Sequence, residues 1–239
     1  MVTELVSAGL VSGLAAGGYA YAANWPTSQI FGPTLLAGAD PAEIALTYDD
    51  GPNDPYTPRL LDILNRYEVR ATFFLIGRFV RQRPGIVRAI RSAGHLIGNH
   101  TMSHPVLLWT SPRRAREELA GCNAAIEDAL GEPVRFFRPP HGARRPDILR
   151  LAHELGLTAV MWNVMGYDWT APPAEKILRH LQSGIRRNRS RCRASNILLH
   201  DGGQAGIGAD RGPTLAATAT LLGTFAGSGL RAVTVDRWS

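Results

Sequence analysis

The sequence predicts an α/β protein whose single catalytic domain is a (β/α) barrel of seven or eight units. Short apolar runs alternate with amphipathic stretches, which is the pattern of βα units around a largely parallel sheet. Apolar residues make up 45% and charged residues 19% of the 239 residues, enough for one large core. Ionisable side chains also recur directly after the predicted strands, at the end of a barrel where chemistry takes place.

The predicted elements follow one another along the chain after residue 41. The candidate strands are short apolar runs: Glu43–Tyr48, Ala71–Ile76, His95–Gly98, Val134–Phe137, Ala159–Asn163, Asn196–Leu199 and Ala232–Val235. The clearest helical patterns begin at a proline, whose missing N–H costs little in a first turn: Pro58–Tyr67, Pro84–Ala93, Pro112–Leu130 and Pro146–Leu155. Seven strands with helices between them fit one barrel better than two domains.

The N-terminal part of the chain has a different composition. Residues 1–24 are hydrophobic and rich in Ala and Gly, and residues 5–39 carry no charge. This stretch predicts a membrane anchor or an export signal, and therefore an extracytoplasmic protein, with a helix packed loosely on the domain as the alternative. Residues 25–40 then predict a linker, and residues 41–239 the catalytic domain.

The net charge limits the kinds of binding partner, and the cysteine content limits the kinds of metal site. The net charge is +6 and the pI about 9.9, which favours polyanions or anionic membranes. The densest basic run, residues 186–193, has no interleaved aromatic residue, so we expect a solvated surface and no nucleic-acid site. Cys122 and Cys192 are too few for a Cys-rich zinc site but could pair with each other. Any metal must therefore be held by histidine and carboxylate side chains.

Two histidines and two aspartates have the spacing of a metal site. His100 and His104 are four residues apart, which predicts that they lie adjacent on one helical face. Asp49 and Asp50 follow the first strand, where alternation along an extended segment would let one bind metal and the other face a bound water. Two histidines and one carboxylate leave positions open, as catalytic sites require. Taken alone, the Asp-Asp-Gly-Pro segment also fits an ordinary turn.

Further ionisable groups follow the later strands. Arg138 comes after the fourth predicted strand, Asp168 after the fifth and His200 after the sixth. Each alone has an ordinary explanation as a surface ion pair, turn or helix cap. Together they place chemistry-bearing groups from separate segments at one end of a barrel.

These segments resemble, in order, the five motifs of the polysaccharide deacetylases, the NodB-homology enzymes of carbohydrate esterase family 4. The motifs are Thr47-Tyr48-Asp49-Asp50-Gly51-Pro52, His100-Thr101-Met102-Ser103-His104, Arg138-Pro139-Pro140-His141-Gly142, Asp168-Trp169 and Leu198-Leu199-His200-Asp201. The resemblance covers roughly residues 43–236. It implies a distorted barrel that hydrolyses acetyl groups from N-acetylglucosamine-type units of a chitin-type or peptidoglycan glycan.

The resemblance also implies a role for each matching residue. Asp50, His100 and His104 would hold a divalent ion, usually zinc, with cobalt or a similar ion possible. Asp49 would be the general base, with Arg138 beside it. His200 would be the general acid, oriented by Asp168. The walls of the acetyl pocket and the oxyanion contact would come from Trp169, Leu198 and the main-chain N–H of His141.

The chain departs from the family pattern at three positions, and other functions stay open. Tyr48 stands where Phe is common, His141 where Tyr is usual, and Met165 where many members have an Asp. The alternatives are an O-acetyl esterase on xylan-type glycans, a hydrolase of non-sugar amides, a glycan-binding module with a vestigial metal, and nucleic-acid binding. The presence of Asp49 and His200 argues against a binding module. Trp109 fits either the core or a sugar groove.

Overall fold

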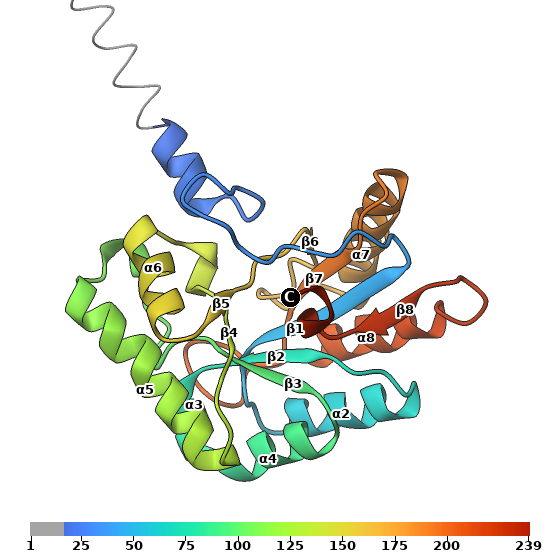
Figure 1. Ribbon diagram of the computed structural model, residues 1–239. Helices are drawn as coiled ribbons and strands as arrows, with labels where there is room; N and C mark the ends of the chain where they lie inside the picture. Colours follow the sequence, from blue (N-terminus) through green and yellow to red (C-terminus); the bar gives the residue numbers. More distant parts are fainter. Residues whose placement is uncertain (1–16) are drawn as a thin grey trace, which may run out of the picture.

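Eight parallel strands form one curled sheet in the computed structural model, which describes residues 17–239 (Figure 1). Their order along the sheet is β5-β4-β3-β2-β1-β7-β6, and β8 pairs with the beginning of β1. The strands are β1 (Glu43–Gly51), β2 (Thr72–Leu75), β3 (Leu96–Asn99), β4 (Phe136–Phe137), β5 (Thr158–Ala159), β6 (Val164–Met165), β7 (Ser195–His200) and β8 (Arg231–Val233). The predicted distorted barrel is confirmed.

Strand β1 lies inside the sheet, where it pairs with three other strands, and it fixes where the site lies. All nine of its residues are buried, as expected for a parallel strand covered on both faces. It pairs with β2 on one side and β7 on the other, and this register places Asp49 directly beside His200. The carboxyl ends of β1 and β7 therefore bring two of the predicted catalytic residues together.

The barrel stays open between β5 and β6. The prediction of one strand over Ala159–Asn163 is wrong, because two short strands replace it, and no ladder joins them within residues 17–239. Side chains take the place of a neighbouring strand here. Arg138 donates to the carbonyls of Val160 and Met161 at 3.3 Å each, and Asn196 donates to the Met161 carbonyl at 2.8 Å.

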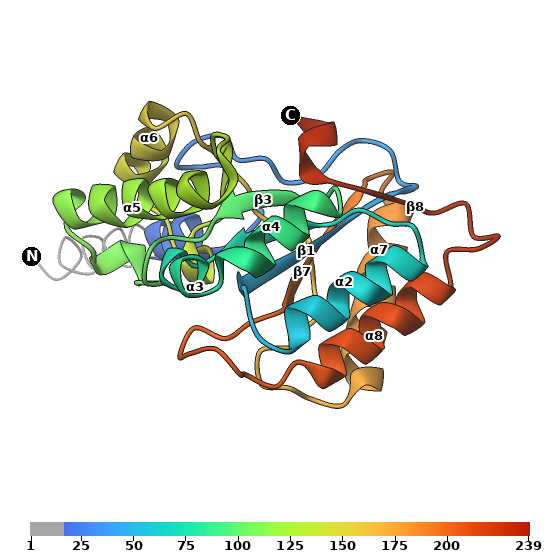
Figure 2. The ribbon, with the colours of Figure 1, turned by 90° about the horizontal axis from the view of Figure 1, so that it is seen from below.

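Helices cover the outside of the sheet, and α2 and α8 lie side by side (Figure 2). They are α2 (Tyr56–Arg66), α3 (Gly77–Gln82), α4 (Pro84–Ser92), α5 (Pro112–Leu130), α6 (Pro146–Glu154), α7 (Ala174–Ser190) and α8 (Gly212–Gly223). The four predicted helices occur with ends within two residues of those expected. In α5, Ser111 caps the first turn and Gly131, with φ of 73°, ends the last.

The segment expected to be a linker packs against the barrel over part of its length. Leu35 donates to the Ala159 carbonyl at 2.8 Å and accepts from the Met161 amide at 2.9 Å, which covers the exposed edge of β5. Of the hydrophobic stretch 1–24, residues 1–16 lie outside the described residues, and residues 17–24 are helical. Within residues 17–239 no helix has both the length and the apolar content to cross a membrane.

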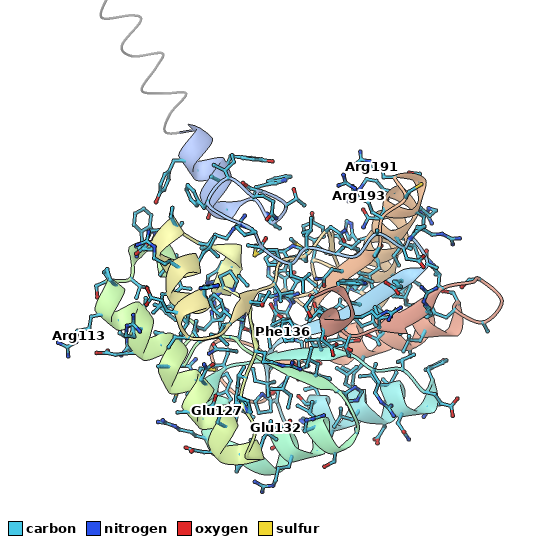
Figure 3. All side chains as sticks on the ribbon, viewed as in Figure 1. Arg113, Glu127, Glu132, Phe136, Arg191 and Arg193 are labelled. Carbon is cyan, nitrogen blue, oxygen red and sulfur yellow. The ribbon has the colours of Figure 1, made fainter. Side chains whose placement is uncertain are left out.

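The arginine run and the cysteines occupy peripheral positions. Arg186 and Arg187 are exposed on α7, and Arg191 and Arg193 project from its end (Figure 3), as expected of a solvated surface. Cys122 is buried and Cys192 exposed, and both are free thiols.

Candidate active site

Asp50, His100 and His104 converge in one place. Asp50 Oδ1 lies 3.5 Å from His100 Nε2 and 3.2 Å from His104 Nε2. One ligand atom from each residue lies within 4.8 Å of the others, close enough to share an ion. The structure thus brings together the three residues predicted as metal ligands.

The histidines meet through a loop, so the expected helical face is wrong. Thr101 and His104 have positive φ values of 66° and 64°, which no helix contains. Buried Glu118 on α5 holds the loop by accepting from the Ser103 amide at 2.7 Å and the Ser103 hydroxyl at 2.6 Å. The rings of His100 and His104 end up 4.9 Å apart.

The simple alternation expected for the two aspartates also fails. Asp50 has a φ of 72°, and the ladder between β1 and β2 is irregular between Asp49 and Gly51. This turn brings both carboxylates to the same ring, since Asp49 Oδ2 lies 3.6 Å from His100 Nε2. The two carboxylates still differ in their other contacts, because Asp50 also lies next to His104 and Asp49 next to Arg138.

The donor set fits a divalent metal ion. His100 Nδ1 lies 2.8 Å from the Arg138 carbonyl and donates to it, which leaves the Nε2 lone pair for a metal. Burial lowers the pKa of His100 well below its ordinary value, and burial likewise lowers the pKa of His104. Both rings are therefore neutral, as ligands must be. Asp50 Oδ1 is buried and has no hydrogen-bond partner among residues 17–239. Two imidazoles and one carboxylate suit zinc or cobalt.

Asp49 is paired with a fully buried arginine. Arg138 Nη1 donates to Asp49 Oδ1 at 2.9 Å and to the Thr47 hydroxyl at 2.6 Å. Its guanidinium carbon also lies 4.2 Å from the centre of the Phe74 ring. Burial raises the pKa of Asp49 to about 6, with Arg138 opposing the shift. Asp49 is therefore ionised at neutral pH, yet basic enough to accept a proton.

His200 is held by a buried carboxylate. Asp168 Oδ1 accepts from His200 Nδ1 at 2.8 Å, and its Oδ2 accepts from the His200 amide and the Thr214 hydroxyl, each at 2.8 Å. Burial lowers the pKa of His200, but Asp168 and the carboxylates of Asp50 and Asp49 outweigh it and raise this pKa to about 9. His200 is therefore protonated at neutral pH.

A cavity of about 370 Å³ joins these groups, and we call it the catalytic cavity. Its lining includes the remaining predicted site residues His141, Trp169 and Leu198, together with Met165 and Trp162. Leu198 is nearly buried, whereas Trp169 is half exposed at the rim. His141 has a φ of 57°, and its ring lies 4.7 Å from that of His104.

Sequence reasoning missed Arg211. This buried arginine donates to the Gly202 carbonyl at 2.6 Å and to the Asp168 and Trp169 carbonyls at 3.3 Å. It therefore ties the loop carrying Asp168 to the loop after His200. No motif surrounds Arg211 in the sequence, so only the tertiary contacts reveal it.

Trp109, which the sequence assigned to either the core or a sugar groove, is 85% exposed. It lines neither the catalytic cavity nor the neighbouring cavity that shares Trp162 and Met165 with it.

The fold and the site define an α/β barrel with an ionised carboxylate, a protonated imidazole and a candidate metal site at the carboxyl ends of its strands. The sequence profile of the polysaccharide deacetylases matches residues 37–160. A peptidoglycan-N-acetylglucosamine deacetylase of Bacillus cereus is 36% identical over 81% of this chain and 86% of its own. A chitooligosaccharide deacetylase of Sinorhizobium fredii is 38% identical over 70% of this chain and 75% of its own. The chain belongs to the polysaccharide deacetylase family.

Solved structures of carbohydrate esterase family 4 have the same fold as this chain. A peptidoglycan N-acetylglucosamine deacetylase in complex with 4-naphthalen-1-yl-N-oxidanyl-benzamide has a TM-score of 0.77 and 30% identity, over 86% of this chain and 92% of that one. A family 4 pseudoenzyme from Bacillus anthracis has a TM-score of 0.73 and 27% identity, over 82% and 65%. Because the fold alone also accommodates a pseudoenzyme, the residues in the cavity have to support the assignment of activity.

Proposed function

We propose that the protein removes acetyl groups from N-acetylglucosamine-type units of a glycan, with a bound divalent metal, Asp49 as base and His200 as acid. The observation that carries this proposal is the placement of an ionised carboxylate and a protonated imidazole in the same cavity as Asp50, His100 and His104. An amide needs both groups, because water must lose a proton and the departing nitrogen must gain one.

Asp49 is suited to take the proton from water. Its Oδ1 accepts from Arg138, so the free Oδ2 is the oxygen that accepts the proton. The Arg138 charge keeps the carboxylate oriented and ionised. When bound, a divalent ion would polarise the acetyl carbonyl and lower the pKa of water. Asp50, His100 and His104 would hold that ion, with zinc first and cobalt second by donor chemistry.

His200 is suited to protonate the leaving nitrogen. Its Nδ1 is bonded to Asp168, so Nε2 carries the proton to be delivered. Trp169 and Leu198 would hold the acetyl methyl, and the main-chain N–H of His141 would face the oxyanion. Met165, near Leu198 on the cavity wall, adds an apolar surface that resists acyl groups longer than acetyl.

Metal removal tests the proposal directly. Protein dialysed against a chelator should stop releasing acetate from N-acetylglucosamine oligomers, and added Zn²⁺ or Co²⁺ should restore release. Metal content by mass spectrometry should fall in His100→Ala and His104→Ala. The control His153→Ala, an exposed histidine on α6, should keep its metal. Full activity in chelated, metal-free protein would refute the assignment.

Replacing Asp168 with asparagine should shift the alkaline limb of the pH–rate profile. An acid works only while protonated, so wild-type kcat/KM should decline as pH rises through the His200 pKa of about 9. Removing the Asp168 charge lowers that pKa, so the decline should begin at lower pH. Steady-state kinetics from pH 5 to 10 would measure the limb, and an unmoved limb would exclude His200 as the acid.

An O-acetyl esterase acting on xylan-type glycans is the alternative within the same chemistry. An alkoxide leaving group needs less protonation than an amine, so loss of His200 should harm ester hydrolysis less than amide hydrolysis. Comparing acetate release by His200→Ala from acetylxylan and from N-acetylglucosamine oligomers separates the two functions.

We propose the cell envelope as the place of action, with residues 41–239 as the catalytic domain. The relatives named for peptidoglycan and chitooligosaccharide deacetylation support this location. The hydrophobic stretch 1–24 would then serve as anchor or export signal. Fractionation of cells expressing the full chain tests this.

A further inference from the structure

A second cavity of about 310 Å³ adjoins the catalytic cavity. Trp162 and Met165 line both cavities, so the two share a wall. The remaining lining comes from three separate parts of the chain: Trp25, Pro26 and Thr27; Asn163, Val164 and Tyr167; and His180, Ser183, Gly184 and Arg187. A ligand longer than the catalytic cavity would therefore have this second cavity next to it.

A chain of aromatic side chains runs from one cavity to the other. The Trp169 ring, at the rim of the catalytic cavity, lies 5.5 Å from the Tyr167 ring, which lies 4.9 Å from that of His180 in the second cavity. Trp25 lies in the same second cavity, 55% exposed. Flat rings with one face exposed can pack against the C–H faces of sugar units while leaving the hydroxyl groups in water.

The N-terminal segment is fixed in this place by a buried arginine. Arg144 donates to the carbonyls of Trp25 and Ser28, each at 2.8 Å, and to that of Gly142 at 2.9 Å. Its amide donates to the Ala23 carbonyl at 3.0 Å. Gly142 follows His141, so one side chain joins the wall of the catalytic cavity to the wall of the second. The position of Trp25 is therefore built into the fold.

The charge in the second cavity has one sign. None of its lining residues is Asp or Glu, and Arg187 contributes a guanidinium. Within residues 17–239 Arg187 forms no ion pair, whereas Arg186 and Arg189 on the same helix do not line the cavity. A carboxylate on the ligand would complement this end of the cavity.

We propose that the second cavity binds the sugar unit next to the reacting one and selects glycan strands that carry carboxylate substituents. Trp25 packs on the sugar and Arg187 pairs with the acid. This inference rests on the proposed deacetylase function and adds the class of strand, an acidic glycan over a neutral one.

The test compares substrate length and charge in the full chain. Trp25→Ala should lower kcat/KM for six-unit N-acetylglucosamine oligomers up to about tenfold, and for two-unit oligomers much less. Arg187→Ala should lower kcat/KM for peptidoglycan glycan fragments with free carboxylates by about two- to fivefold, an effect that added salt should weaken. Neutral oligomers of equal length should lose much less with this variant.

Two controls match these variants. Trp109→Ala removes an exposed tryptophan outside both cavities, and Arg186→Ala removes the neighbouring arginine on α7, so both should behave as wild type. Equal losses on short and long substrates in Trp25→Ala, or on neutral and acidic ones in Arg187→Ala, would overturn the proposal.

Calorimetric titration of the same oligomers separates this proposal from the function it rests on. Weaker binding of six-unit oligomers to Trp25→Ala than to wild type supports the subsite even if no acetate is released. Unchanged binding in both variants, with normal turnover, removes the subsite and leaves the deacetylase intact.

Discussion

Asp49→Asn is expected to lower kcat for acetate release by about 10²–10⁴-fold, the range for loss of a general base. The amide oxygen of asparagine can still accept from Arg138 Nη1, which is 2.9 Å from Asp49 Oδ1 in the wild type. The fold should therefore survive, while the carboxylate proposed to accept the proton is gone. Steady-state kinetics on an N-acetylglucosamine oligomer measure the loss.

The metal content of Asp49→Asn shows whether the lost activity comes from a missing base or from a missing metal ligand. Asp50, His100 and His104 are unchanged, so the ion should remain bound, and a variant that loses both metal and activity would assign Asp49 to the metal instead. Asp62→Asn, an exposed aspartate on α2, is the matched control and should keep wild-type rates. Activity within threefold of wild type in Asp49→Asn would exclude this residue as the base.

Arg138→Met is expected to cost about 3–5 kcal/mol of folding free energy, the usual loss when one partner of a buried ion pair is removed. Arg138 is fully buried, and its removal leaves Asp49 as an unpaired buried charge. It also removes hydrogen bonds to the Val160 and Met161 carbonyls in the gap between β5 and β6. Denaturation followed by tryptophan fluorescence gives the free energy of unfolding.

A double variant separates the charge from the hydrogen bonds. Adding Asp49→Asn to Arg138→Met removes the unpaired carboxylate and should recover part of the lost stability. The control Arg113→Met lies at a side chain 91% exposed and should change the free energy of unfolding by less than about 0.5 kcal/mol. A single variant as stable as wild type would show that Arg138 does not support the barrel.

The sequence predicted the barrel and its central strands because long buried runs such as Glu43–Tyr48 carry a strong apolar signal. It failed at Ala159–Asn163, where two-residue strands are too short to leave a periodic pattern. It also assigned residues 100–104 to a helix by spacing alone. The histidines meet because Thr101 and His104 adopt a left-handed backbone conformation, which cannot be predicted from these residue types.

The sequence also did not predict the side chains whose roles depend on tertiary contacts. Arg211 and Arg144 bind main-chain carbonyls of segments far away in the sequence, so no local pattern marks them. Trp25 fell in an expected linker, because Pro and Gly near it are typical of loops. The predicted chemical groups around Asp50 and His200 were found together because each follows a strand of one parallel sheet.

The left-handed residues around the cavity have a consequence for how the protein is handled. Asp50, Thr101, His104 and His141 all hold positive φ angles, and such backbone costs about 1–3 kcal/mol per residue. Such angles persist only where the surrounding structure holds them, so we expect these loops to relax first when the core is weakened by heat, solvent or mutation. A preparation can therefore keep a normal far-ultraviolet spectrum and already have lost its catalytic geometry.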